Sequence, residues 1–179
     1  PEEANLSDET VTAIRASETG AILFWSPTEA QLVLPPFPVE SEIASSGWDT
    51  SLLSLVLERR WTVLVLLLRM SGFAVGIFEG ERLALSKTGT RFVKGRHKKG
   101  GSSSARFARR REDQARMLFD KAAETLQERV ETYTGNLTHL ILGGDRLTLL
   151  GFEKRCPFLQ RLDVVRLHRL LNVEHPSLN

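Results

Sequence analysis

The sequence predicts an α/β domain with a mixed, mainly antiparallel sheet, one long helix after a basic loop, and a β-containing extension at the N-terminal side. Three observations support this fold class. Between residues 61 and 93, three apolar or alternating runs are separated by short glycine-containing breaks, which is the pattern of an antiparallel meander. From 108 to 133, apolar residues recur at helical spacing. A short apolar run, 137–142, then predicts one more strand.

Residues 1–60 are predicted to form the N-terminal extension, packed on the main domain. Three elements are expected there: a short amphipathic helix after Ser7, a hairpin with strands at 21–25 and 31–34, and a helix at 51–60. The proline-rich LPPFP stretch at 34–38 ends the hairpin. We interpret it as a rigid connector, with a ligand for a proline-recognising domain as the alternative.

Residues 61–179 are predicted to form the main domain. Its first strand, 61–69, is apolar on both faces and should therefore lie in the centre of the sheet. The long helix should begin at one of the serines 102–104 and run about 28 residues, or roughly 40 Å. After the strand at 137–142 we expect a helix within 146–158, stopped around Pro157, and a last element at 163–170 that the pattern leaves open between strand and helix.

Composition argues against several classes of protein. A single cysteine, Cys156, allows no intrachain disulfide and favours a reducing, cytoplasmic location. No signal peptide opens the sequence, and the longest apolar run, 63–68, is far below the roughly 20 residues that span a bilayer, so no membrane association is expected. The four histidines are scattered without ligand spacing, so neither a metal nor an organic cofactor is predicted.

The most distinctive stretch is basic: KGRHKKGGSSSARFARRREDQ, residues 94–114. Residues 87–116 hold eleven lysines or arginines against two acids, whereas the whole chain carries only +2. Such concentrated charge indicates a polyanionic partner, most often nucleic acid, rather than a solvated basic face. The residues predicted to bind RNA are Arg96, Lys98, Lys99, Arg106, Arg109 and Arg110.

This stretch resembles a known loop. Gly100-Gly101 is followed, after four intervening residues, by the Arg-Phe-Ala-Arg of 106–109. The central domain of eukaryotic and archaeal class-one peptide-chain release factors has a Gly-Gly-Gln loop followed by Ser-Ala-Leu-Arg-Phe-Ala-Arg. The resemblance extends over about 61–153 and implies a ribonuclease-H-like fold. Among relatives of that domain, the chain is most similar to the Vms-type peptidyl-tRNA hydrolases, including their bacterial members.

The resemblance implies a function. It is hydrolysis of the ester between nascent peptide and tRNA on a stalled large ribosomal subunit, as part of ribosome rescue. The implied partners are the large ribosomal subunit and peptidyl-tRNA, and no metal is needed. In such a site Gly100 and Gly101 would give the loop its reach, while Ser102, Ser103 and Ser104 stand where the attacking water is positioned.

The loop departs from the family pattern because it has no glutamine. Release-factor spacing puts the missing residue at Ser102, and the looser Vms-type spacing puts it at Ser104; Gln114 lies too far along the helix to substitute. Three explanations stay open: a natural variant that uses backbone amides and a serine hydroxyl, a relative without hydrolytic activity, or a loop altered from the natural sequence. The alternative functions are therefore an RNA- or ribosome-binding factor without chemistry and a partner-protein binder that uses LPPFP.

Overall fold

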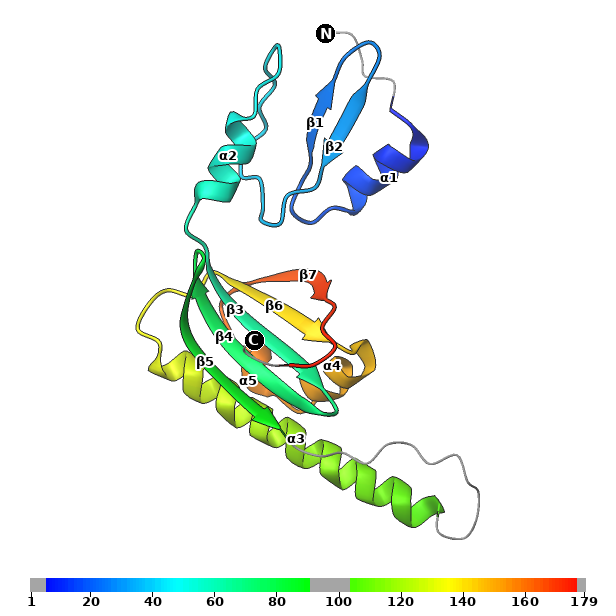
Figure 1. The fold of residues 1–179 in the computed structure, drawn as a ribbon, viewed down its shortest axis with the longest axis vertical. Coiled ribbons are helices and arrows are strands. Elements are labelled where there is room, and N and C mark those ends of the chain that lie inside the picture. The colour runs from blue at the N-terminus through cyan, green and yellow to red at the C-terminus, as the bar shows by residue number, and fades with distance from the viewer. Residues whose placement is uncertain (1–5, 91–103, 177–179) are drawn as a thin grey trace. The chain divides into compact units, whose positions relative to one another are not determined.

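The computed structural model describes residues 6–90 and 104–176 (Figure 1). The chain divides into two compact units, Pro1–Arg60 and Trp61–Asn179. The predicted packing of the extension on the main domain stays a prediction.

The first unit contains the three predicted elements. They are α1 (Asp8–Ala16), the antiparallel hairpin of β1 (Ile22–Trp25) and β2 (Ala30–Val33), and α2 (Ser51–Glu58). Ser7 caps α1, because its hydroxyl oxygen accepts a hydrogen bond of 3.2 Å from the backbone N–H of Thr10. Ile22, Phe24, Pro35 and Val56 are the buried residues of this unit among those described.

The second unit is built on a five-stranded sheet of order β5-β4-β3-β6-β7 (Figure 1). The strands are β3 (Thr62–Arg69), β4 (Gly72–Glu79), β5 (Arg82–Thr90), β6 (His139–Gly144) and β7 (Val165–Leu171). Strand β4 pairs with β3 and with β5 in antiparallel orientation. Strand β6 pairs in parallel with β3, and β7 pairs in parallel with β6. Only β4 therefore runs against the other strands, but its two antiparallel pairings are the longest in the sheet. The predicted mixed, mainly antiparallel sheet is confirmed, with β3 at its centre.

One face of the sheet carries the helices. The long helix α3 (Ser104–Thr132) and α4 (Arg146–Glu153) meet through Phe119 and Phe152, whose ring centroids are 6.1 Å apart. Both rings belong to a core that includes the fully buried side chains of Leu64, Leu66 and Leu68 from β3. This core fixes the C-terminal half of α3 to the sheet.

The structure corrects one predicted element after α3 and decides another. The predicted helix at 146–158 is two helices, and Pro157 begins the second one, α5 (Pro157–Gln160), instead of stopping the first. Proline fits the first turn of a helix because the N–H that it lacks would have no partner there. The last element, left open at 163–170, is strand β7. Cys156 is buried between the two helices, and burial raises the pKa of its thiol.

Asp145 caps α4 and gives a testable pH dependence. Its carboxylate accepts hydrogen bonds from the hydroxyl and the backbone N–H of Thr148, at 2.7 and 2.9 Å, and these bonds hold its pKa below the usual value of 3.8. Asp145→Ala should lower the free energy of unfolding by about 1 kcal/mol near neutral pH. A carboxylate with a lowered pKa stabilises the fold above its unfolded pKa and loses this effect as the pH falls through the folded pKa. The difference between wild type and variant should therefore shrink only below about pH 3.8.

Urea unfolding at a series of pH values measures this difference. Asp163→Ala is the matched control, since Asp163 is exposed and caps no helix, and it should change stability by less than about 0.5 kcal/mol. A deficit of Asp145→Ala that stays constant down to pH 2 would show that the charged carboxylate is not what stabilises α4.

Candidate nucleic-acid interface

The predicted site residues fall into two groups. Seven of them lie outside the described residues: Arg96, Lys98, Lys99, Gly100, Gly101, Ser102 and Ser103. The other four belong to α3: Ser104 is its first residue, and Arg106, Arg109 and Arg110 follow within two turns. The described part of the candidate site is therefore the start of α3.

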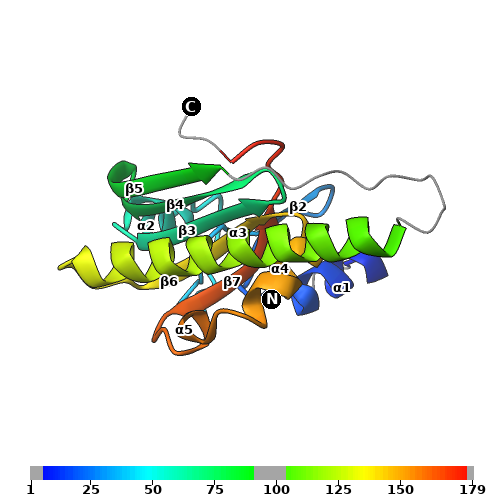
Figure 2. The ribbon, with the colours of Figure 1, turned by 90° about the horizontal axis from the view of Figure 1, so that it is seen from below.

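The first half of α3 stands apart from the core. We call residues 104–117 the basic arm. Within 105–117 no side chain is buried, although Arg111, Gln114 and Ala115 are half-buried, and full burial begins at Leu118. Fourteen helical residues extend about 21 Å at 1.5 Å per residue. Figures 1 and 2 show this half of α3 continuing past the sheet, beyond the end of β5.

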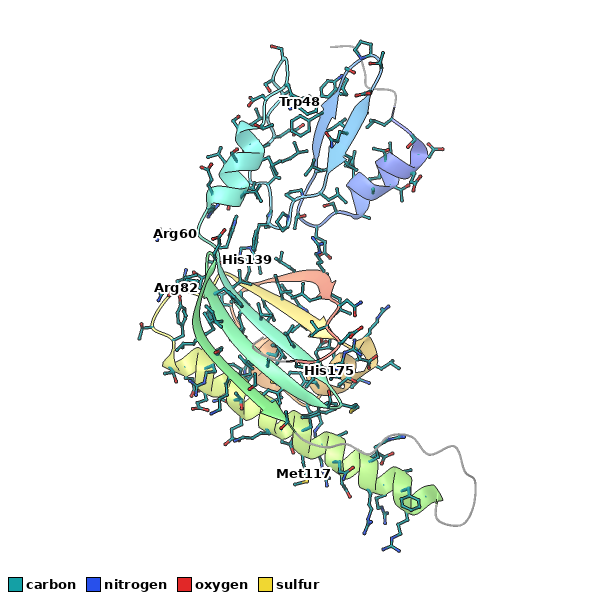
Figure 3. All side chains as sticks on the ribbon, viewed as in Figure 1. Trp48, Arg60, Arg82, Met117, His139 and His175 are labelled. Atoms are coloured by element: carbon teal, nitrogen blue, oxygen red, sulfur yellow. The ribbon has the colours of Figure 1, made fainter. Side chains whose placement is uncertain are left out.

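Helical periodicity separates the charges of the arm from the packed stripe. Leu118, Ala122 and Leu126 are fully buried and mark the side of α3 that faces the sheet. At 3.6 residues per turn, Arg106 lies about 160° around the helix from Ala122, and Arg109 and Arg110 share its side. Met117 is on this side too, and Figure 3 shows it on the part of α3 away from the strands. The three arginines thus form one outward-facing row.

The arm is electrostatically unbalanced. No acid stands in the first turn of α3, and of the two acids that follow, Asp113 pairs with Arg116 at 2.8 Å. Among the described residues, Arg106, Arg109 and Arg110 are exposed and form no ion pair. A cation in the first turn of a helix, such as Arg106, typically costs about 0.3–1 kcal/mol, a cost that a bound anion offsets. The geometry therefore suits phosphate groups spaced along one side of the arm.

A second basic surface was not predicted from the sequence. A cavity of about 490 Å³ lies between α4 and β7, and its lining includes Arg146, Arg166 and Arg169. One of these cations is neutralised, because Arg166 pairs with Glu153. Arg146 lies twenty positions from Arg166. No sequence spacing signals this cluster, since it forms only when α4 packs beside β7.

The described residues contain neither a metal-ligand cluster nor a membrane-spanning helix. Over 6–90 and 104–176, no three histidine, cysteine, aspartate or glutamate side chains gather as metal ligands would. Within the same ranges, no helix is long and apolar enough to cross a bilayer.

The second unit is similar in sequence to peptide-chain release factors. Residues 61–179 match the sequence model of a family described as Actinobacteria/chloroflexi VLRF1 release factor. Two proteins named peptide chain release factor subunit 1 are similar over 117 residues: one from Archaeoglobus fulgidus at 29% identity and one from Methanopyrus kandleri at 32%. Each alignment covers 64% of this chain and 28% of the relative.

Two solved structures are also similar. One is the crystal structure of the archaeal translation termination factor aRF1, at 19% identity and a TM-score of 0.46, covering 89% of this chain and 44% of the other. The second is described as an archaeal protein, at 18% identity and a TM-score of 0.33, covering 89% and 45%. The chain spans less than a third of the length of the curated relatives that it matches.

Proposed function

The chain belongs to the Actinobacteria/chloroflexi VLRF1 release factor family, and from that premise we propose that it acts on the ribosome in termination or rescue of translation. More specifically, we propose a peptidyl-tRNA hydrolase of the Vms type, which frees nascent chains from stalled large ribosomal subunits.

The basic arm is the observation that carries this proposal. A loop that must reach a buried reaction centre inside ribosomal RNA needs a support that tolerates dense phosphate. The arm supplies one, because no side chain from 105 to 117 is buried and Arg106, Arg109 and Arg110 form one outward row. Counterion release from phosphates on binding such cations would supply affinity without sequence preference.

The proposed reaction needs only water as co-reactant. Water attacks the carbonyl carbon of the peptidyl ester, the bond from that carbon to the ribose oxygen of the tRNA breaks, and the departing oxygen takes up a proton. The peptide leaves with a free carboxyl group. In this scheme Gly100 and Gly101 let the backbone approach the ester closely, and a side chain at Ser102 or Ser104 helps to hold the water. The arm's arginines bind ribosomal and tRNA phosphates.

One observation favours a second candidate function. The loop holds serines where the resembling families have glutamine, and a hydroxyl on a short side chain is a weaker holder of water than an amide. The alternative is therefore a ribosome-binding rescue factor that does not hydrolyse the ester. Both candidates use the same cationic arm, so binding experiments test what they share, and release experiments separate them.

The cationic arm, which both candidate functions use, predicts how binding depends on salt concentration. Replacing Arg109 and Arg110 together by alanine should lower the slope of log affinity against log salt concentration, for large ribosomal subunits or tRNA, by roughly 1 to 2 units, because each phosphate contact contributes about 0.7 to 0.9. Titrations at several salt concentrations, followed by sedimentation or fluorescence anisotropy, give the slope.

The matched control is Lys154→Ala with Arg161→Ala, which removes the same charge from exposed positions of the same unit outside the arm. Its slope should stay within about 0.5 unit of wild type. If the arm variant and the control change the slope equally, only net charge matters and the arm does not touch phosphate.

A further inference from the structure

The first unit contains a groove that the release-factor relationship does not explain, since the matched family begins at Trp61. The groove has a volume of about 620 Å³, within the range of ligand-binding clefts. It lies between β1, the irregular segment 39–49 and the start of α2. Its lining includes the aromatic and aliphatic side chains of Phe24, Trp25, Ile43, Trp48 and Leu52.

Two tryptophans give the groove an unusual surface. Trp48 is 72% exposed and Trp25 is 48% exposed. The Trp48 ring stacks on Phe24, with centroids 4.8 Å apart and an interplanar angle of 25°, so one face of the indole is held by the protein. Figure 3 shows Trp48 at the irregular segment beside β1. Grouped exposed aromatics of this size typically mark an interaction site.

The charge of the groove is negative. Two carboxylates, Glu42 and Asp49, belong to its lining, and among the described lining residues none is basic. Asp49 accepts a hydrogen bond of 2.9 Å from the backbone N–H of Ser51, and hydrogen bonds from Ser51 hold the pKa of this carboxyl below its usual range, so it is ionised at neutral pH. The sequence of the first 60 residues contains ten acids against three arginines, opposite in sign to the basic arm.

We propose that this groove binds an arginine side chain presented by a basic segment of a partner protein. A guanidinium group stacks on the exposed face of an indole and donates paired hydrogen bonds to carboxylates, and the groove offers both partners in Trp48 and in Glu42 or Asp49. Nucleic acid fits less well, because phosphates would approach a unit of net negative charge. The chain would then hold RNA through the arm of one unit and a basic protein through the groove of the other.

The test uses the full chain and two fluorescein-labelled synthetic peptides of equal length and charge, one of alternating arginine and glycine and one of alternating lysine and glycine. Fluorescence anisotropy should show the arginine peptide binding about threefold to tenfold more tightly than the lysine peptide. Trp48→Ala should lower the affinity for the arginine peptide at least about fivefold, so that the two peptides bind about equally well. Glu42→Gln should weaken it about threefold.

Glu58→Gln is the matched control for charge, since Glu58 is exposed at the end of α2 and does not line the groove. It should change the affinity of the arginine peptide by less than about twofold. Thermal unfolding of Trp48→Ala checks the fold, and Glu42→Gln tests the same groove without removing an aromatic ring. Equal binding of the two peptides, or an arginine advantage that survives both groove variants, overturns the proposal.

Two further measurements distinguish the proposed occupant of the groove from RNA and from the chain's own basic arm. A labelled single-stranded RNA should bind Trp48→Ala and wild type equally; weaker binding by the variant would make the groove a platform for nucleobases. The arginine peptide should bind wild type and the Arg109→Ala, Arg110→Ala variant within about a factor of two. Tighter binding by that variant would identify the chain's own basic arm as the occupant, and would overturn the proposal without touching the function assigned to the arm.

Discussion

Glutamine in place of Ser104 is expected to raise peptidyl-tRNA cleavage on stalled complexes at least tenfold. A positioned hydrogen-bonding group in a hydrolytic site is typically worth on the order of 10² to 10³ in rate, and a serine hydroxyl reaches about 2 to 3 Å less far than a glutamine amide. The same gain is expected at Ser102 if the loop follows release-factor spacing. Affinity for the ribosome should stay within a factor of about three, because the cations that contact phosphate are unchanged.

Single-turnover release of nascent peptide from purified stalled complexes measures this effect, with serine and glutamine proteins side by side. Ser103→Gln is the matched control, since neither family spacing places the glutamine there, and it should release no faster than the parent. If neither Ser102→Gln nor Ser104→Gln gains activity while ribosome binding is normal, the hydrolase proposal fails. The RNA-binding factor without chemistry then takes its place.

The sequence predicts the sheet and the long helix well because their signals are local. Strand β3 is apolar on both faces, and its central place follows from that fact alone. Helix α3 has a long apolar stripe with serines before it and Gly135-Asn136 after it, and it runs from Ser104 to Thr132. The sequence does not distinguish strand from helix at β7, because the burial of this strand depends on tertiary packing. Of its residues only Leu167 is buried, so the sequence shows no clear alternation.

The geometry of the site was less predictable. The charges of the arm are plain in the sequence, but the point at which full burial begins, Leu118, is not, because Ala108 and Ala115 continue the apolar stripe although neither is buried. Alanine occurs both on packed and on exposed helix faces, so it does not show where packing ends. The sequence also has no pattern that predicts the groove of the first unit. Trp25 and Trp48 lie 23 positions apart, and Trp48 stands in a stretch without regular structure.

The arm is a helix that connects the core to the loop and holds the loop in position. Proline at Ala115 should interrupt this helix. Proline there removes the hydrogen bond to the carbonyl of Arg111 and costs about 3 kcal/mol of helix stability, whereas glycine costs about 1 kcal/mol. No described side chain from 105 to 117 is buried, so Ala115→Pro should leave the thermal unfolding of the core nearly unchanged. It should uncouple the loop from its support.

In the Ser104→Gln protein, Ala115→Pro is therefore expected to lower single-turnover peptide release about 100-fold, the loss that a displacement on the order of 1 Å can cause. Ala115→Gly is the graded control and should cost only a few-fold, because it weakens the helix without removing a hydrogen bond. Affinity for tRNA should fall by less than about threefold in both, since every arginine of the arm remains. Release by the proline variant at the parental rate would show that the loop finds its position on the ribosome without a rigid arm.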